Sequence, residues 1–335
     1  MTGAPPGRTV FEMRVRLVLM AALALGAISI LPAPTSACDS TGCLLLTRGQ
    51  NGVMAKGTWR VDLSLRNTDQ SDPRRGSDPA TLVLRPKIYF EQERVIPAYH
   101  LDRDGRERFL QADLAYGLFD RTTVFLSLPA ATQRAQDVVH GAVNTAYDIW
   151  GVGDGMIGLR QSLAARGALV GGLALKAPLA QHTLIDEYDQ TILEPTLQPG
   201  SGAWSVVPSL QYSFTGLVPD ISWTTSASYE ITTTNDHDYR FGNEAIATLG
   251  ASRPLVGALS GSLQAKVFHK GRSTYRGAGV ASTGTTVVYL TPGVRVRGPA
   301  GVGLYTFFQA PVYRYVNEAQ LAPSYGWLVG LTRSF

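Results

Sequence analysis

Charged side chains recur at alternate positions in several segments of this 335-residue chain. In residues 57–66, Arg60 and Asp62 alternate with Trp59 and Val61. A period of two places polar side chains on one face of a β-strand and apolar ones on the other. In a closed barrel that spans a membrane, the polar face lines the interior, where charges pair with one another or contact a solute. Extended along the chain, the pattern selects eight lumen-lining candidates: Arg60, Asp62, Asp113, Arg160, Lys176, Glu230, Lys266 and Arg295.

Histidine and serine are the residue types that would carry hydrolysis, and one pair has a suggestive spacing. His269 and Ser273 are the two ends of the pentapeptide His-Lys-Gly-Arg-Ser. A serine nucleophile also needs a group that orients the base and donors that stabilise an oxyanion, and the sequence identifies neither. We therefore predict no catalytic site. A barrel enzyme that acts on lipid or peptide is the alternative.

Acidic residues gather beside His182 in one expected loop, where they could bind a divalent cation. They are Asp186, Glu187, Asp189 and Glu194. Their spacing does not follow the strict pattern of a calcium-binding loop. We interpret them as solvated loop charges, and we predict no metal site and no cofactor.

Cys38 and Cys43 are the only cysteines of the chain. An exported chain meets an oxidising compartment, and the residues between the two cysteines allow a tight loop, so we favour a disulfide. A metal site would need further ligands, and no histidine lies nearby. Lipidation of Cys38 is a third alternative, although Thr35 stands where lipoprotein signals usually carry leucine.

Twelve alternating segments would position the candidate residues. The expected strands are 57–66, 108–118, 122–130, 155–164, 168–178, 203–214, 220–231, 241–252, 259–270, 285–296, 301–314 and 324–335. Short connections such as 119–121 alternate with long ones such as 131–154, as the periplasmic turns and extracellular loops of outer-membrane barrels do. The sequence thus predicts an all-β fold, a transmembrane antiparallel up-and-down β-barrel of about 12 strands.

The long connection at residues 67–107 leaves the strand number open. It is dense in charge, but it contains apolar runs at 81–84 and 88–90 on either side of Pro86. These runs could form a small hairpin, a plug inside the lumen or two more wall strands. Pro86 argues against a central strand because proline cannot donate to the hydrogen-bond ladder. Fourteen strands remain the alternative.

The last segment predicts how the barrel is closed and delivered. Tyr325, Trp327, Val329, Leu331 and Phe335 share one strand face. An apolar face toward lipid is typical of a transmembrane barrel strand, and we predict that this ending is the assembly signal. Tyrosine and tryptophan near strand ends predict interfacial girdles. The residues assigned to them are Tyr116, Trp204, Tyr212, Trp223, Tyr229, Tyr289, Tyr305, Tyr325 and Trp327.

The beginning of the chain has the pattern of a secretory signal peptide. Arg14 and Arg16 precede an apolar run at 17–31 and a small-residue exit at 35–37, and the polar start favours Met13 as the true initiator. We expect three parts: a signal peptide at 1–37, a periplasmic segment at 38–56 with the cysteine pair, and the barrel at 57–335. The net charge of +4 falls toward zero on cleavage, so it gives no indication of a nucleic-acid partner.

Several motifs resemble the outer-membrane family named for the meta pathway of phenol degradation. They are residues 116–121 (Tyr-Gly-Leu-Phe-Asp-Arg), Val124 to Pro129, Gly151 to Asp154, Leu159, residues 197–204 (Leu-Gln-Pro-Gly-Ser-Gly-Ala-Trp), and Gly330-Leu331 before Phe335. The resemblance runs from about Trp59 to the C-terminus. The Gln-Pro-Gly-Ser-Gly-x-Trp segment is its most specific element.

The resemblance implies an outer-membrane channel or transporter for passive passage of a small solute of hydrophobic or aromatic character. It implies outer-membrane lipids, the barrel assembly machinery and the solute as partners, in the cell outer membrane of a Gram-negative bacterium. The cysteine segment, the charged connection at 67–107 and Arg333 depart from the family pattern. A barrel enzyme and a structural or adhesive barrel are the alternatives.

Overall fold

The structure is a computed structural model that describes residues 52–164 and 168–335. The predicted signal peptide, Cys38 and Cys43 lie outside the described residues. Within the described ranges, no helix is both long enough and apolar enough to cross a membrane.

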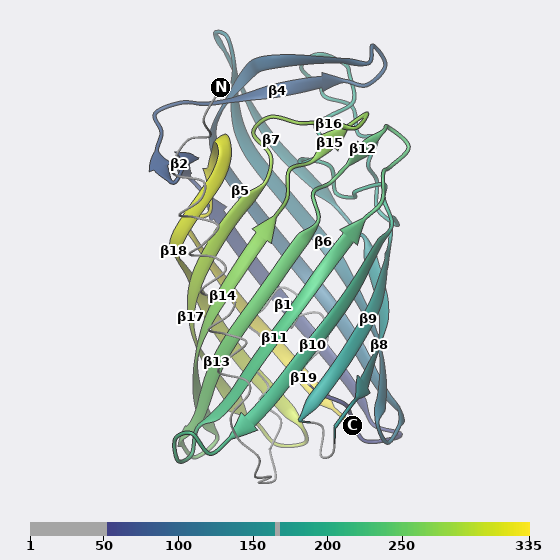
Figure 1. Ribbon diagram of the computed structural model, residues 1–335, viewed down its shortest axis with the longest axis vertical. Helices are drawn as coiled ribbons and strands as arrows, with labels where there is room; N and C mark the ends of the chain where they lie inside the picture. The colour runs from purple at the N-terminus through teal and green to yellow at the C-terminus, as the bar shows by residue number, and fades with distance from the viewer. Residues whose placement is uncertain (1–51, 165–167) are drawn as a thin grey trace, which may run out of the picture.

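Twelve strands of the described chain form the wall of a closed antiparallel barrel (Figure 1). They are β1 (Trp59–Gln70), β5 (Arg94–Phe119), β6 (Thr122–His140), β8 (Gly155–Ser162), β9 (Leu169–Ala177), β10 (Ser205–Thr215), β11 (Ser222–Thr232), β13 (Glu244–Val256), β14 (Leu259–Lys270), β17 (Thr285–Arg297), β18 (Val302–Ala322) and β19 (Tyr325–Ser334). Each wall strand pairs with the next along the chain, and β1 pairs with β19 to close the ring. The predicted twelve-stranded barrel is confirmed.

The outer face of the wall is apolar because the strands alternate as the sequence indicates. On β1, Trp59, Val61 and Leu63 are 43–46% exposed, whereas Asp62 between them is 2% exposed. Large apolar side chains that face outward around a closed barrel form the belt that contacts lipid. The outer face turns polar higher up, where Arg108 Nε donates to Asn67 Oδ1 over 3.2 Å.

Several strands continue beyond this belt and form a cap over the extracellular mouth (Figure 1). The cap contains β4 (Val83–Tyr89), β7 (Val143–Gly151), β12 (Tyr239–Arg240), β15 (Thr274–Tyr275), β16 (Ala278–Gly279) and the connection at residues 179–204. Short β2 (Asp72–Gly76) and β3 (Asp78–Pro79) lie beside the upper end of β18.

Residues 67–107 supply no additional wall strand, since they hold the ends of β1 and β5, the short β2 and β3, and a hairpin of β4 with β5. β4 pairs with the upper half of β5, and the register shifts between Arg85 and Lys87, where Pro86 interrupts the ladder. The expected loop at 131–154 is likewise mostly strand, since β6 continues to His140 and pairs with β7. Hairpin pairing above the membrane satisfies the backbone locally, so these segments need no partner in the wall.

The girdle prediction is wrong for two of the aromatic residues, Tyr289 and Tyr305, because their side chains point into the lumen. Tyr305 is 1% exposed and its hydroxyl donates to Asp62 Oδ1 over 2.6 Å. The ring fits because Gly330 faces it across the β18–β19 pair, where a Cβ would lie 2.2 Å from Tyr305 Cζ. A buried tyrosine is stable when its hydroxyl finds a partner, and Asp62 supplies one.

Candidate functional site in the barrel lumen

The upper lumen contains a chamber of about 380 Å³ between the wall and the cap. Wall strands supply most of its lining, and residues 195–201 of the cap cover part of it. Its lining includes seven cationic side chains, Arg66, Arg85, Arg106, Arg134, Lys176, Lys266 and Lys270, and five acidic ones, Asp102, Glu107, Asp154, Glu230 and Glu244. The chamber therefore has an excess of positive charge.

The eight sequence-selected charges divide into two groups. Lys176, Glu230 and Lys266 line the chamber, where Lys176 forms an ion pair with Glu230 and Lys266 Nζ lies 4.3 Å from the centre of the Tyr289 ring. The other five, Arg60, Asp62, Asp113, Arg160 and Arg295, stand on wall strands nearer the periplasmic end.

This lower group is joined by hydrogen bonds and by contacts with aromatic rings. Gln111 Nε2 donates to Asp113 Oδ1 over 2.9 Å, and Arg60 Nε donates to Ser334 Oγ over 3.1 Å. The guanidinium of Arg160 lies 4.5 Å from the centre of the Phe125 ring. These charges are therefore held by contacts with neighbouring side chains of the wall.

The sequence pattern assigns no aromatic residue to the lining of the chamber. Phe109, Phe241, Phe268 and Tyr289 all contribute to the lining. Arg66 lies over the Phe109 ring at 4.5 Å, and Lys270 lies over the Phe241 ring at 5.3 Å. Arg66 stands two residues beyond Ser64 on the polar face of the expected strand 57–66, so the same alternation that selects Arg60 and Asp62 would have identified it.

The motifs that suggested a family meet at the edge of the chamber. Asp154 Oδ2 accepts hydrogen bonds from the Ser201 amide, over 2.8 Å, and from the Ser201 hydroxyl, over 2.6 Å. Gln198 is 2% exposed, and its amide group bonds to both backbone groups of Leu184. The glycine-rich segment and the Gln-Pro-Gly-Ser-Gly segment therefore fold residues 179–204 inward over the lumen.

The acidic residues near His182 are buried partners in the cap, which corrects the interpretation of Asp186, Asp189 and Glu194 as solvated loop charges. Asp186 is 2% exposed and accepts hydrogen bonds from Lys87 Nζ, over 2.7 Å, and from the Tyr147 hydroxyl, over 2.8 Å. Lys87, itself 1% exposed, also lies 3.5 Å from Asp189. Because Lys87 belongs to β4, this ion pair fastens the hairpin to residues 179–204.

A histidine between two carboxylates makes a second connection in the cap. His100 Nε2 lies 3.2 Å from Asp102 Oδ1 and 3.0 Å from Glu194 Oε1. Burial lowers the pKa of His100, but the charge of Glu194 and the hydrogen bond to Asp102 outweigh burial and raise it overall. For the neighbouring His140, burial and the charge of His100 lower the pKa.

The described segment before β1 packs against the inner face of the wall. Met54 packs against Ala115, Phe125, Met156, Ala174 and Val207, which come from five neighbouring wall strands. The Met54 amide donates to Thr123 Oγ1 over 2.8 Å. Gly117 leaves room for this segment, since a Cβ there would lie 2.0 Å from the carbonyl oxygen of Ala55.

His269 and Ser273 make separate contacts in the described structure. His269 Nδ1 lies 2.8 Å from Thr286 Oγ1 on the neighbouring wall strand. Ser273 is buried, and its hydroxyl accepts a hydrogen bond from the Gly242 amide over 3.3 Å.

The closed wall and its apolar outer belt define an outer-membrane β-barrel. The family model described as "Putative MetA-pathway of phenol degradation" matches residues 139–326, which is more than half of the chain, and the protein belongs to this family. No curated protein matches the sequence. The predicted family and the predicted location in the outer membrane are confirmed.

Solved structures match this chain at low sequence identity. An outer-membrane channel from Pseudomonas putida F1 matches with a TM-score of 0.57 and 12% identity, over 85% of this chain and 97% of that one. The β-domain of the Bordetella autotransporter BrkA matches with a TM-score of 0.47 and 11% identity, over 84% of this chain and 100% of that one. The CymD monoaromatic hydrocarbon channel matches with a TM-score of 0.42 and 13% identity, over 84% of this chain and 89% of that one.

Proposed function

We propose that this protein is an outer-membrane channel through which a small hydrophobic or aromatic solute passes passively, with no chemical step. The chamber under the cap is the observation that carries the proposal. Its volume of about 380 Å³ lies in the range of about 300–1,000 Å³ that is common for small-molecule sites. Membership of a family whose name refers to phenol degradation supports an aromatic solute.

The chemistry of the lining narrows the solute class. Phe109, Phe241 and Tyr289 contribute aromatic surface to the lining. A cation lies over one face of each ring: Arg66 over Phe109, Lys270 over Phe241 and Lys266 over Tyr289. Aromatic surface with an excess of cations favours a planar solute that carries an anionic or hydrogen-bond-accepting group. We infer that an aromatic carboxylate or phenolate fits this lining better than an aromatic cation of the same size.

Passage requires both ends of the lumen to open. Toward the outside, the contacts of Lys87 and His100 hold the cap over the mouth. Toward the periplasm, Met54 fills the space between five wall strands. Passive flux then depends on the fraction of time that these contacts are broken, since neither end is closed by the wall itself.

We further propose that the ends of the chain serve delivery. The outward face of Tyr325, Val329 and Leu331 contacts lipid, and the terminal strand is the part that the assembly machinery recognises. The signal peptide at 1–37 directs export.

The direct test is flux into liposomes that contain the purified, refolded protein without an oligohistidine tag. We expect benzenesulfonate to enter faster than benzyltrimethylammonium, and we expect neither to need an energy source. Absence of flux above that of protein-free liposomes would refute the channel. Equal flux of the two ions would refute the anion preference and leave the channel intact.

Two variants that each remove one positive charge test whether the preference for anions arises in the chamber. Lys266→Gln should lower benzenesulfonate flux several-fold, because it removes a positive charge from the lining. Lys266 is 1% exposed, so water screens this charge only weakly. Arg253→Gln removes the same charge at an exposed position near a periplasmic turn and should leave flux unchanged. Heat-modifiable migration of both variants checks that they fold.

A further inference from the structure

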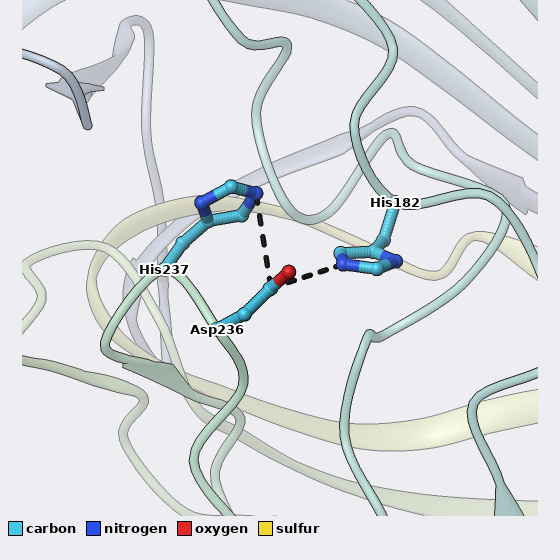
Figure 2. Close-up of side chains that lie close together, drawn as sticks. All are labelled: His182, Asp236 and His237. Carbon is cyan, nitrogen blue, oxygen red and sulfur yellow. Dashed lines mark hydrogen bonds and ion pairs between the residues drawn. The ribbon is translucent and has the colours of Figure 1, made fainter.

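Two histidines and an aspartate meet on the extracellular cap (Figure 2). None of the three lines the chamber or contacts Lys87. His182 Nε2 lies 3.0 Å from Asp236 Oδ1, and His237 Nε2 lies 3.8 Å from the same oxygen. The ligand atoms of all three residues lie within 4.8 Å of one another. The carboxylate stands between the two imidazole rings (Figure 2).

The local backbone holds each ring in place. Asn235 Oδ1 accepts hydrogen bonds from the amides of His237 and Tyr239, which folds a tight turn around Asp236. The His237 ring lies 5.2 Å from the Phe90 ring of the β4–β5 hairpin. Gly202, at a φ of +66°, lies against His182, and a Cβ there would be 2.5 Å from His182 Cδ2. The cluster is therefore built from the connection at 179–204 and the β11–β12 connection.

Hydrogen bonding within the described residues does not account for the whole arrangement. His237 Nε2 is buried and has no hydrogen-bond partner in the described structure, although it points toward the Asp236 carboxylate. A buried ring nitrogen without a partner needs an explanation, and a bound cation supplies one. Asp236 is more than half exposed, with 62% of its side chain accessible, which gives a cation a path from the solvent.

Two imidazoles and one carboxylate form a donor set that zinc and its neighbours in the first transition row prefer. Tetrahedral bonds of about 2.0–2.2 Å place ligand atoms about 3.3–3.6 Å apart. The separation of 3.0 Å is shorter than this range and the separation of 3.8 Å is longer, so small side-chain rotations bring both into it. Water can fill the fourth position because the carboxylate side faces the solvent.

We propose that His182, Asp236 and His237 bind one divalent transition-metal ion of the zinc class, which cross-links residues 179–204 to the β11–β12 connection and fastens the cap. The site differs from the acidic cluster that the sequence pointed to, since Asp186 and Asp189 bind Lys87 instead. His182 was the single residue of that region that belongs to it.

The test is zinc titration of the refolded, metal-free, untagged protein by calorimetry, with metal analysis after dialysis. We expect one equivalent per chain at this site. His182→Ala and His237→Ala should each weaken binding by at least about tenfold, since even a lost outer-shell contact costs that much. His269→Ala, which removes a histidine from the wall, is the matched control and should bind like the wild type.

A cysteine-free variant distinguishes zinc binding at this site from zinc binding by the cysteines. Cys38→Ser with Cys43→Ser should retain the equivalent that His182→Ala loses. Zinc binding that is the same in the wild type and in both cluster variants would overturn the proposal, as would zinc binding that disappears with the cysteines alone.

Protection of the cap gives an independent readout. Zinc at about one hundred times its dissociation constant should slow proteolytic cleavage within residues 179–204 by about one hundredfold, because it binds only the closed arrangement. His237→Ala should abolish this protection. Unchanged cleavage of the wild type at saturating zinc would contradict a metal that joins the two connections.

Discussion

The barrel wall and the extracellular cap are stabilised in different ways. The wall is a continuous ladder of backbone hydrogen bonds between neighbouring strands, and its side chains alternate between lipid and lumen. The cap has short strands, and buried charges from distant parts of the chain hold it, such as Lys87 and Asp186, which are 99 residues apart. The wall is therefore closed as a unit, whereas the cap can open where a few contacts break.

Removal of the terminal residue should have the largest effect, because it acts on the wall. The Phe335 amide donates to the Trp59 carbonyl over 2.9 Å, and the Trp59 amide donates to the Phe335 carbonyl over 3.2 Å. Deletion of Phe335 should abolish accumulation of folded barrel in the outer membrane. Heat-modifiable migration of protein from the membrane fraction measures the amount of folded barrel. Normal folding of the protein without Phe335 would refute the proposed assembly signal.

Loss of one buried charge should have the next largest effect, confined to the cap. Lys87→Met leaves Asp186 buried without its cation, which costs about 3–5 kcal/mol in known buried pairs. We expect rapid proteolysis within residues 179–204 and an intact wall by heat-modifiability. The matched variant Arg94→Met removes an exposed cation from the same hairpin and should leave cleavage slow.

Substitution of two leucines with nearly the same exposure tests whether the wall faces lipid and the cap faces water. Leu63 on the wall is 46% exposed and Leu84 on β4 is 45% exposed. Leu63→Arg should destabilise folding by about 2–4 kcal/mol, because arginine then faces hydrocarbon. Leu84→Arg should change stability by less than about 0.5 kcal/mol, as surface substitutions usually do. Urea unfolding in lipid vesicles compares them, and equal effects would show that the two faces share one solvent.

The smallest effect is a pH dependence of the cap. The pKa of His100 is raised in the folded cap, because the charge of Glu194 and the hydrogen bond to Asp102 outweigh burial. The stabilisation is therefore complete below the unfolded pKa of about 6.5. It is lost as the pH rises through the higher folded pKa. Below about pH 6.5, protonation of His140, whose pKa is lowered, acts in the opposite direction.

Cap cleavage measured across this pH range checks the direction. The ratio of wild-type to His100→Gln cleavage rates removes the pH dependence of the protease itself. This ratio should rise several-fold from pH 6.5 toward alkaline pH. A ratio that stays constant would show that His100 does not hold the cap by its charge.

The wall could be predicted because its signal is local. In β1, every second residue from Trp59 to Leu65 is apolar, so the strand and its faces follow from the sequence. The faces of β18 did not follow, because Leu304, Tyr305, Phe307 and Phe308 place large apolar groups on both sides. The pattern therefore predicts Tyr305 in a girdle, whereas its hydroxyl bonds to Asp62 inside the lumen.

The cap could not be predicted because no period connects its partners. Nothing between Lys87 and Asp186 indicates that they meet, and the same holds for His182 and Asp236. Pairing of β4 with β5 brings Lys87 over the mouth, and the hydrogen bonds of Asp154 with Ser201 fold the other partner inward. Contacts of this kind follow only from the three-dimensional arrangement.

Single-channel conductance in a planar bilayer tests most directly whether the lumen is a passage closed by side chains rather than by the wall. Met54→Gly removes a side chain that packs among inward-facing residues of five wall strands, and it leaves every wall strand unchanged. We predict brief, small openings for the wild type and a several-fold larger current for Met54→Gly. Absence of current from both proteins, or identical currents, would contradict the account.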